Sequence, residues 1–244
     1  MDLGFVHIDT DFDVRSDSGG RDPDAASATL KKFHKILWNK KLPNGEMFKV
    51  SDNLPSHYLL GQTNSRSISL SSDTICNSYL KRKSIQSIIE TSDQRIDLFR
   101  KKVYSVGGFI LFPAKKVDGL NTINQERGWL KSIDDRFDLT LECIRLFYLS
   151  QNSPLFPVLS RYSDFFEIFV DFRGYVTFFL LQDMVSKDFK SINYFLPVEI
   201  PFSGKPLPQT RDDYYKFMHN AQEFLQARNQ RILSWVNKSD KKSQ

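Results

Sequence analysis

The sequence contains very little cysteine. Cys76 and Cys143 are the only two in 244 residues, and each lies among apolar neighbours. A disulfide framework uses several cysteine pairs, and a structural zinc site uses ligands at close spacing. The two cysteines therefore predict buried free thiols rather than a disulfide or a metal centre.

Long uncharged apolar runs are also missing. The most apolar stretch, residues 162–185, is interrupted by Asp164, Glu167, Asp171, Arg173 and Asp183. A membrane span needs roughly 20 mostly uncharged residues. We therefore expect buried helices and no membrane partner. The first residues show no basic segment followed by an apolar one, so the expected location is cytoplasmic.

Signatures of known catalytic and nucleotide-binding sites are absent as well. The sequence has no GxxxxGK[ST], GxGxxG, HExxH or GxSxG motif, and its four histidines show no metal-ligand spacing. Asp9, Asp11 and Asp13 do not continue into an EF-hand loop. A strand over residues 5–14 would place these carboxylates on one face, which could be a solvated face or could hold Mg²⁺, the one candidate cofactor.

Apolar side chains are plentiful in spite of these absences. Hydrophobic residues make up 40% of the sequence and aromatic residues 14%, enough for one large core. Strand-like segments occupy residues 47–50, 58–60, 67–70 and 103–113. Apolar residues at helical spacing from Leu30 to Trp38 predict a helix capped by Ser27, or by Asp24 if it starts earlier. Helical periodicity dominates from about residue 129 to 186 and again over 211–236. Residues 192–200 are expected to form a last strand.

These patterns predict an α+β fold, with a strand-rich N-terminal half packed on a helical C-terminal half. We expect a single domain over residues 1–236 and a disordered basic tail over 237–244. The net charge is +5, and basic residues gather at 31–41, 81–83 and 100–102. A basic balance permits contact with nucleic acid without requiring it.

Charged residues in the segment 123–147 are the best candidates for a site. On a helix starting at Asp135, the side chains of Asp135, Asp138, Glu142 and Arg145 would share one face, while the other faces are apolar. Charges beside a core must be paired or must face a cavity, since an unpaired buried charge costs several kcal/mol. The segment predicts either an internal ion-pair network or a charged pocket.

Several segments together resemble a known family. They are SDSGGRDPDAASATLKKFHKILW, ISLSSDTI, VGGFILFP, INQERG, DRFDLTLECIRLFY and DFRGYVTFFLLQD. The sequence over about residues 10–232 is similar to mostly bacterial proteins known only as a domain of unknown function. The resemblance implies a single domain and no particular activity.

The functional hypothesis is a pocket that binds a phosphate-bearing ligand, a nucleotide or nucleic acid. The expected anion-binding residues are Arg21, Arg127, Arg136 and Arg145, and the expected catalytic or metal-orienting carboxylates are Asp135, Asp138 and Glu142. The alternative is a non-catalytic interaction protein whose charged residues only join helices. A pocket would leave Arg127 and Glu142 reachable by solvent, and a network would seal them. Catalysis and oligomeric state stay open.

Overall fold

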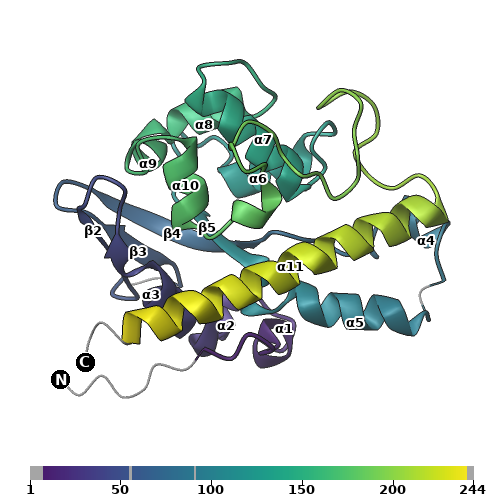
Figure 1. Cartoon of the computed structure of the whole chain (residues 1–244), viewed down its shortest axis with the longest axis horizontal. Coiled ribbons are helices and arrows are strands. Elements are labelled where there is room, and N and C mark those ends of the chain that lie inside the picture. Colours follow the sequence, from purple (N-terminus) through teal and green to yellow (C-terminus); the bar gives the residue numbers. More distant parts are fainter. Residues whose placement is uncertain (1–7, 55–56, 91, 241–244) are drawn as a thin grey trace.

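A five-stranded antiparallel sheet lies at the centre of the protein (Figure 1). The computed structural model describes residues 8–54, 57–90 and 92–240. The strands follow one another across the sheet in chain order: β1 (Lys40–Lys41), β2 (Met47–Ser51), β3 (Leu59–Gln62), β4 (Ser67–Thr74) and β5 (Phe109–Pro113). The strands predicted over residues 47–50, 58–60 and 67–70 are therefore confirmed, whereas only residues 109–113 of the strand predicted over 103–113 form one.

Three short helices lie on one side of the sheet: α1 (Val14–Asp17), α2 (Pro23–Ala26) and α3 (Ala28–Trp38). Each begins where an Asp or Ser side chain accepts a backbone N–H of the first turn: Asp13 for α1, Asp22 for α2 and Ser27 for α3. Of the two predicted caps for this helix, Ser27 and Asp24, the structure has Ser27 at the start of α3.

The strand expected over residues 5–14 is wrong for its described part, residues 8–14. Asp9 accepts the N–H of Asp11, and Asp13 caps α1. Aspartate side chains that bond to nearby backbone groups favour turns and helix starts over strands, and the alternating pattern could not show this competition. Residues 5–7 lie outside the described residues.

A buried carboxylate joins α2 to the sheet. β4 extends beyond the start of β3, so that Ser72 has no partner strand on that side, and its N–H donates to Asp24 Oδ2 at 2.8 Å. Asp24 is 5% exposed. Burial raises the pKa of the Asp24 carboxyl from 3.8 to about 6, although the Ser72 hydrogen bonds oppose the change.

This pKa predicts that stability falls as the pH rises from about 4 to about 6. In that interval the folded state binds more protons than the unfolded state, so the free energy of unfolding decreases with pH, by about 3 kcal/mol over the whole interval. Asp24→Asn keeps an oxygen for the Ser72 N–H and should remove this decrease. Urea denaturation of both proteins at pH 4, 5, 6 and 7 tests the expectation, and a pH-independent difference between them would contradict it.

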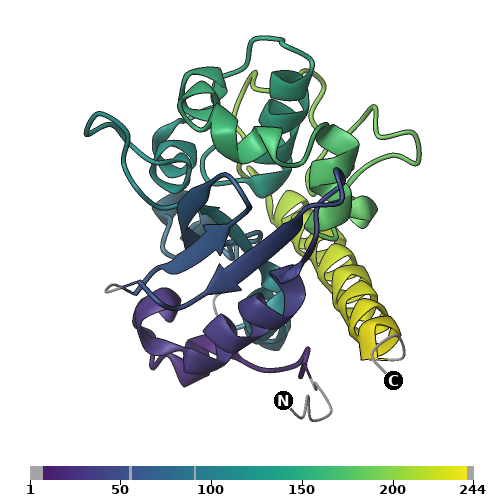
Figure 2. The same cartoon turned by 90° about the vertical axis from the view of Figure 1, so that its left-hand side faces the viewer.

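Five helices form a cap on the opposite side of the sheet (Figures 1 and 2). They are α6 (Ile123–Trp129), α7 (Phe137–Tyr148), α8 (Phe156–Arg161), α9 (Ser163–Glu167) and α10 (Phe172–Phe178). A capping box of Thr122 and Gln125 starts α6, and the Asp171 side chain starts α10. A 3₁₀ turn, η2 (Gln182–Met184), follows α10.

The last helix, α11 (Arg211–Asp240), runs along the molecule beside α5 (Gln94–Val103) (Figure 1). Between β4 and α5 the chain forms the short α4 (Lys83–Gln86), and a 3₁₀ turn, η1 (Val106–Gly108), leads into β5. The predicted C-terminal helix is confirmed, and it continues four residues beyond position 236. Residues 241–244 of the predicted tail lie outside the described residues.

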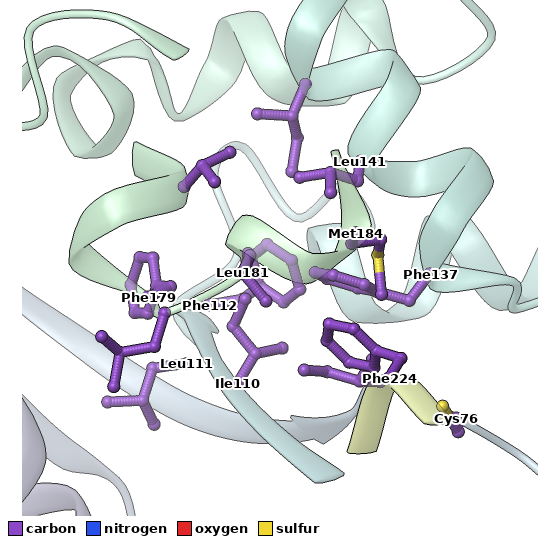
Figure 3. Close-up of a cluster of buried hydrophobic side chains, with 14 of the residues drawn as sticks. Cys76, Ile110, Leu111, Phe112, Phe137, Leu141, Phe179, Leu181, Met184 and Phe224 are labelled. Carbon is purple, nitrogen blue, oxygen red and sulfur yellow. The ribbon is translucent and has the colours of Figure 1, made fainter. Parts of the chain in front are cut away.

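One core joins the two halves (Figure 3). Side chains of β5, α7, η2 and α11 meet above the sheet, among them Ile110, Phe112, Phe137, Met184 and Phe224. β5 is buried along its whole length because it lies between the cap and the rest of the sheet. The α+β class and the single-domain arrangement are confirmed.

The strand expected over residues 192–200 is wrong. Only an isolated bridge between Val185 and Ile192 forms there. The N–H of Phe195 donates to the side chain of Asp138 instead of to a neighbouring strand. Pro197 also lacks an N–H for a ladder.

Both cysteines are buried and free, as predicted. Burial raises the pKa of the Cys143 thiol to about 12 and that of Cys76 well above its usual range, so neither is a thiolate at neutral pH. In the described part of the chain, no helix has the length and apolar character needed to cross a membrane.

Candidate functional site

The charged residues of segment 123–147 do not form the single helix face expected from the sequence. α7 begins at Phe137, so Arg136 is its N-cap residue and Asp135 precedes it. Asp134 and Asp135 both have left-handed backbones, with φ of 45° and 67°. The prediction that Asp135 shares a helix face with Asp138 is therefore wrong: a tight turn, which spacing alone does not reveal, separates them.

Arg127 lies at the centre of the first ion pair. Its side chain is fully buried and its Nη1 is 2.5 Å from Asp73 and 3.5 Å from Asp135. The same guanidinium donates to the carbonyl oxygens of Thr74 and Asp135 and to the Thr140 hydroxyl. Arg127 thus joins α6 to β4 and to the turn before α7.

Arg136 and Asp138 form a second, fully buried ion pair. The guanidinium of Arg136 also donates to the carbonyl oxygens of Leu196 and Pro206, and the Asp138 carboxylate accepts the N–H of Phe195. The pair therefore fastens the irregular segment 195–206 to the start of α7.

Glu142 and Arg145 form the third pair, with two contacts of 2.7 Å on α7 itself. Their side chains are 7% and 18% exposed. This pair reaches the surface, and it joins no other element through an ion pair among the described residues.

These distances favour the ion-pair network over the charged pocket for this segment. Arg127, Arg136 and Asp138 are sealed, with at most 1% exposure, and Glu142 is only 6% exposed. Their hydrogen-bonding groups are occupied by neighbouring protein groups, as a buried charge requires. Binding a ligand there would require these contacts to break.

A buried cation that sequence reasoning missed is Arg228 of α11. It is fully buried and donates to the carbonyl oxygens of Gly107, Phe109 and Phe179, with no carboxylate in ion-pair distance in the described residues. Its position could have been noticed from spacing, because it stands four residues from both Phe224 and Ile232 on the buried side of the helix.

A pocket lined by positive charges lies between residues 15–23, residues 77–82 and the end of α5. Its volume is about 320 Å³. The charged residues in its wall are Arg15, Arg21, Lys81, Arg82 and Arg100, and none of its lining residues is acidic. We call it the basic pocket. Four other cavities in the described residues each include at least one Asp or Glu in their walls.

The basic pocket gathers some of the predicted residues and not others. Arg21 lies in it, whereas Arg127, Arg136 and Arg145 do not. Two of the three basic blocks, 81–83 and 100–102, contribute to it. The block 31–41 faces elsewhere: Lys40 and Lys41 line a different cavity, and Lys35 pairs with Asp52.

The sealed ion pairs support one wall of the basic pocket. Asp135, held by Arg127, accepts a hydrogen bond from Asn77, which lines the pocket, and Asp134 pairs with Arg82 at 2.5 Å. Tyr79 in the same wall has a φ of 54°. Left-handed backbone conformations therefore occur both in the pocket wall and in the turn at Asp134 and Asp135 that supports it. Such conformations cost free energy and persist where surrounding contacts hold them.

The contact between Ser72 and the buried His34 resembles a nucleophile beside its base, but its hydrogen bonds exclude that role. His34 Nδ1 accepts from Trp38 Nε1 at 3.0 Å, so in the neutral ring Nε2 carries the proton and donates to Ser72 Oγ. Burial lowers the pKa of His34 to about 3, which keeps it neutral. A histidine in this state cannot take the serine proton.

Metal ligands are not gathered anywhere in the described residues: no group of three or more His, Cys, Asp or Glu side chains could hold an ion. The Asp9 carboxylate accepts the N–H of Asp11, and the Asp13 carboxylate caps α1. Mg²⁺ as a cofactor stays a prediction.

The fold and the pocket define a single-domain α+β protein with an exposed cationic cavity. The chain belongs to a family of unknown function, DUF6994, whose model matches residues 8–232. The predicted membership of such a family is confirmed, and a bacterial origin stays a prediction. No curated protein matches the sequence. No solved structure matches it either.

Proposed function

We propose that the protein binds a phosphate-bearing ligand, a nucleotide or the phosphorylated end of a nucleic acid, in the basic pocket. The observation that supports this most is the charge of the wall, with five cationic side chains and no carboxylate. Guanidinium groups that converge on one cavity suit phosphate oxygens, which accept their paired N–H donors.

The wall retains positive charge after its own ion pairs are counted. Arg82 is paired with Asp134 and Arg100 with Asp97. Arg15, Arg21 and Lys81 are exposed and have no carboxylate at ion-pair distance among the described residues. These three side chains can turn toward an anion without first losing an acidic partner.

The shape of the pocket limits the ligand. About 320 Å³ is at the small end of the range for ligand pockets, roughly 300–1,000 Å³. A phosphate with one sugar or base fits this volume better than a dinucleotide does. Tyr104 in the wall lies under Arg15 at 5.5 Å and offers an aromatic surface beside the cations.

The alternative is a non-catalytic interaction protein, and the sealed ion pairs are what support it. In that case the ion pairs only hold the helices and strands together. The cytoplasmic location also stays a prediction, for which the two buried free thiols are the expected pattern.

Binding of two single-stranded oligonucleotides of equal length, with and without a 5′ phosphate, tests the proposal. We expect the phosphorylated strand to bind more tightly at low salt. Arg21→Ala and Arg15→Ala should each weaken its binding about tenfold or more, since a charge-assisted hydrogen bond contributes about 1.5–3 kcal/mol. Adenosine monophosphate as competitor distinguishes a nucleotide site from a strand-binding surface.

The matched control is Lys190→Ala, which removes one positive charge from a side chain that is 83% exposed and outside the pocket. Its affinity should be close to that of the unmodified protein. Equal weakening by all three variants would mean that net charge alone drives binding, and absence of binding by the unmodified protein at low salt would refute the proposal.

A further inference from the structure

A groove between α5 and α11 lies next to the basic pocket. The two helices run side by side (Figure 1). Toward one end of the groove the guanidinium of Arg95 lies over the ring of Tyr215 at 4.2 Å, and further along Asn229 donates a hydrogen bond to the Ser105 hydroxyl. The volume of this cavity, which we call the α5–α11 groove, is about 880 Å³.

The groove and the basic pocket adjoin at the C-terminal end of α5. Arg100 and Tyr104 line the basic pocket. The residues that directly follow them, Lys101 and Ser105, line the groove. Successive residues of a helix point in directions about 100° apart, so Lys101 lies beside Arg100 around the axis of α5. A ligand longer than the basic pocket can therefore pass across this end of α5 into the groove.

The groove carries unpaired positive charge where it adjoins the basic pocket. Lys101 and Lys102 are exposed and have no carboxylate at ion-pair distance among the described residues. In the described part of the wall, Asp11 is the one acidic residue. Two free ammonium groups beside a phosphate-binding pocket suit the next phosphates of a strand, because each can neutralise one backbone charge.

The rest of the wall offers groups that suit bases. Gln222, Gln226 and Gln230 stand at four-residue spacing on one face of α11, and within the described residues none of their side chains forms a hydrogen bond. An amide side chain has both donors and an acceptor, as the edges of bases do. The Arg95 side chain lies over Tyr215 and is 61% exposed, so a base can stack on the outer side of its guanidinium.

We propose that the ligand is a single strand of nucleic acid, whose phosphorylated end lies in the basic pocket while the next nucleotides cross α5 into the groove. This mode of binding rests on the proposed phosphate recognition in the basic pocket. If one nucleotide fills the basic pocket, of about 320 Å³, the groove of about 880 Å³ has room for about two or three more. Lys101 and Lys102 contact phosphates there, and the amides of α11 contact bases.

The affinity of the unmodified protein for 5′-phosphorylated adenylates of one, two, four and six nucleotides, at one low salt concentration, tests this proposal. We expect the affinity to rise about tenfold or more from one nucleotide to four and to level off by six, since added nucleotides contact the protein only as far as the groove extends. The series is measured in deoxyribose and in ribose form, and a rise in either form supports the proposal.

The length series separates this proposal from phosphate binding itself. Equal affinity for one and four nucleotides would overturn the strand in the groove and leave phosphate binding in the basic pocket standing. Absence of binding at every length would refute both.

Two variants test the place of the strand. Lys101→Ala combined with Lys102→Ala should reduce the salt dependence of binding the four-nucleotide strand, by about 0.7 in the slope of log affinity against log salt for each lost phosphate contact. The affinity of this variant for the mononucleotide should stay within about twofold of that of the unmodified protein, since one nucleotide does not reach the groove. Gln226→Ala should weaken binding of the strand severalfold with an unchanged slope, because it removes no charge.

Matched controls come from exposed residues outside both cavities: Lys187→Ala combined with Lys190→Ala, and Gln151→Ala. These variants should bind the four-nucleotide strand as the unmodified protein does. Equal reduction of the slope by the two lysine pairs would mean that net charge alone attracts the strand, and it would overturn the proposed path through the groove.

Discussion

Asp138→Asn is expected to lower the free energy of unfolding by about 3–5 kcal/mol. The substitution keeps the shape of the side chain and removes its charge, which leaves the fully buried guanidinium of Arg136 without a counter-charge. The amide also offers an N–H group where Arg136 and the Phe195 N–H are both donors. Because domains are typically stable by only 5–15 kcal/mol, this loss threatens folding at moderate temperature.

Glu142→Gln is the matched control, since it makes the same chemical change one helical turn further along α7. Its partner Arg145 is 18% exposed and can turn toward water, so we expect a loss of about 1 kcal/mol or less. Urea denaturation measures both losses of unfolding free energy, provided that the slope of this free energy against urea concentration is the same in all the proteins. Similar small losses in the two variants would contradict a structural role for the Arg136–Asp138 pair.

Arg228→Met should cost about 3 kcal/mol or more. Arg228 donates to three buried carbonyl oxygens, those of Gly107, Phe109 and Phe179, and each such oxygen left without a donor costs about 1–3 kcal/mol. Removing a buried charge recovers part of this cost, because the guanidinium has no carboxylate partner in the described residues. The three carbonyls outweigh that gain, since methionine offers none of them a hydrogen bond.

The control for this prediction is Arg231→Met, the same substitution three residues along α11. Arg231 pairs with Asp183, and the two side chains are 37% and 28% exposed, so the expected loss is below about 1 kcal/mol. Thermal or urea unfolding of both variants provides the comparison. A stability of Arg228→Met equal to that of Arg231→Met would show that the buried guanidinium is not needed to join α11 to β5.

Local patterns predicted the elements that local interactions define. Ser27 was identifiable as a helix cap because its bond to the N–H of Leu30 spans only three residues. The spacing of the charged residues wrongly placed Asp135 on the helix. The turn before α7 depends on a hydrogen bond from Arg127, eight residues earlier in the chain. The alternation of apolar and polar residues wrongly predicted a strand over residues 8–14. A strand also needs a neighbouring strand to pair with, and the tertiary structure determines whether one is present.

The candidate site divides in the same way. The sequence marked Arg21 as a possible anion ligand, and the structure places it beside Arg15, Lys81, Arg82 and Arg100. The joint position of these side chains could not be read from the sequence, since they come from segments up to 85 residues apart. For the same reason, the sequence could not show that Lys101 of α5 and Gln226 of α11 line the same groove.

By itself, the sequence determined the α+β class, the single core, the free thiols and membership of the family. These properties follow from composition, periodicity and short-range capping, each of which acts within a few residues or on the whole chain at once. Only the tertiary structure decided which charges are sealed as Arg127, Arg136 and Asp138 are, and which remain open as in the basic pocket. The reason is that the free energy of a charge depends on its solvent and its partners, and folding brings both from distant parts of the chain.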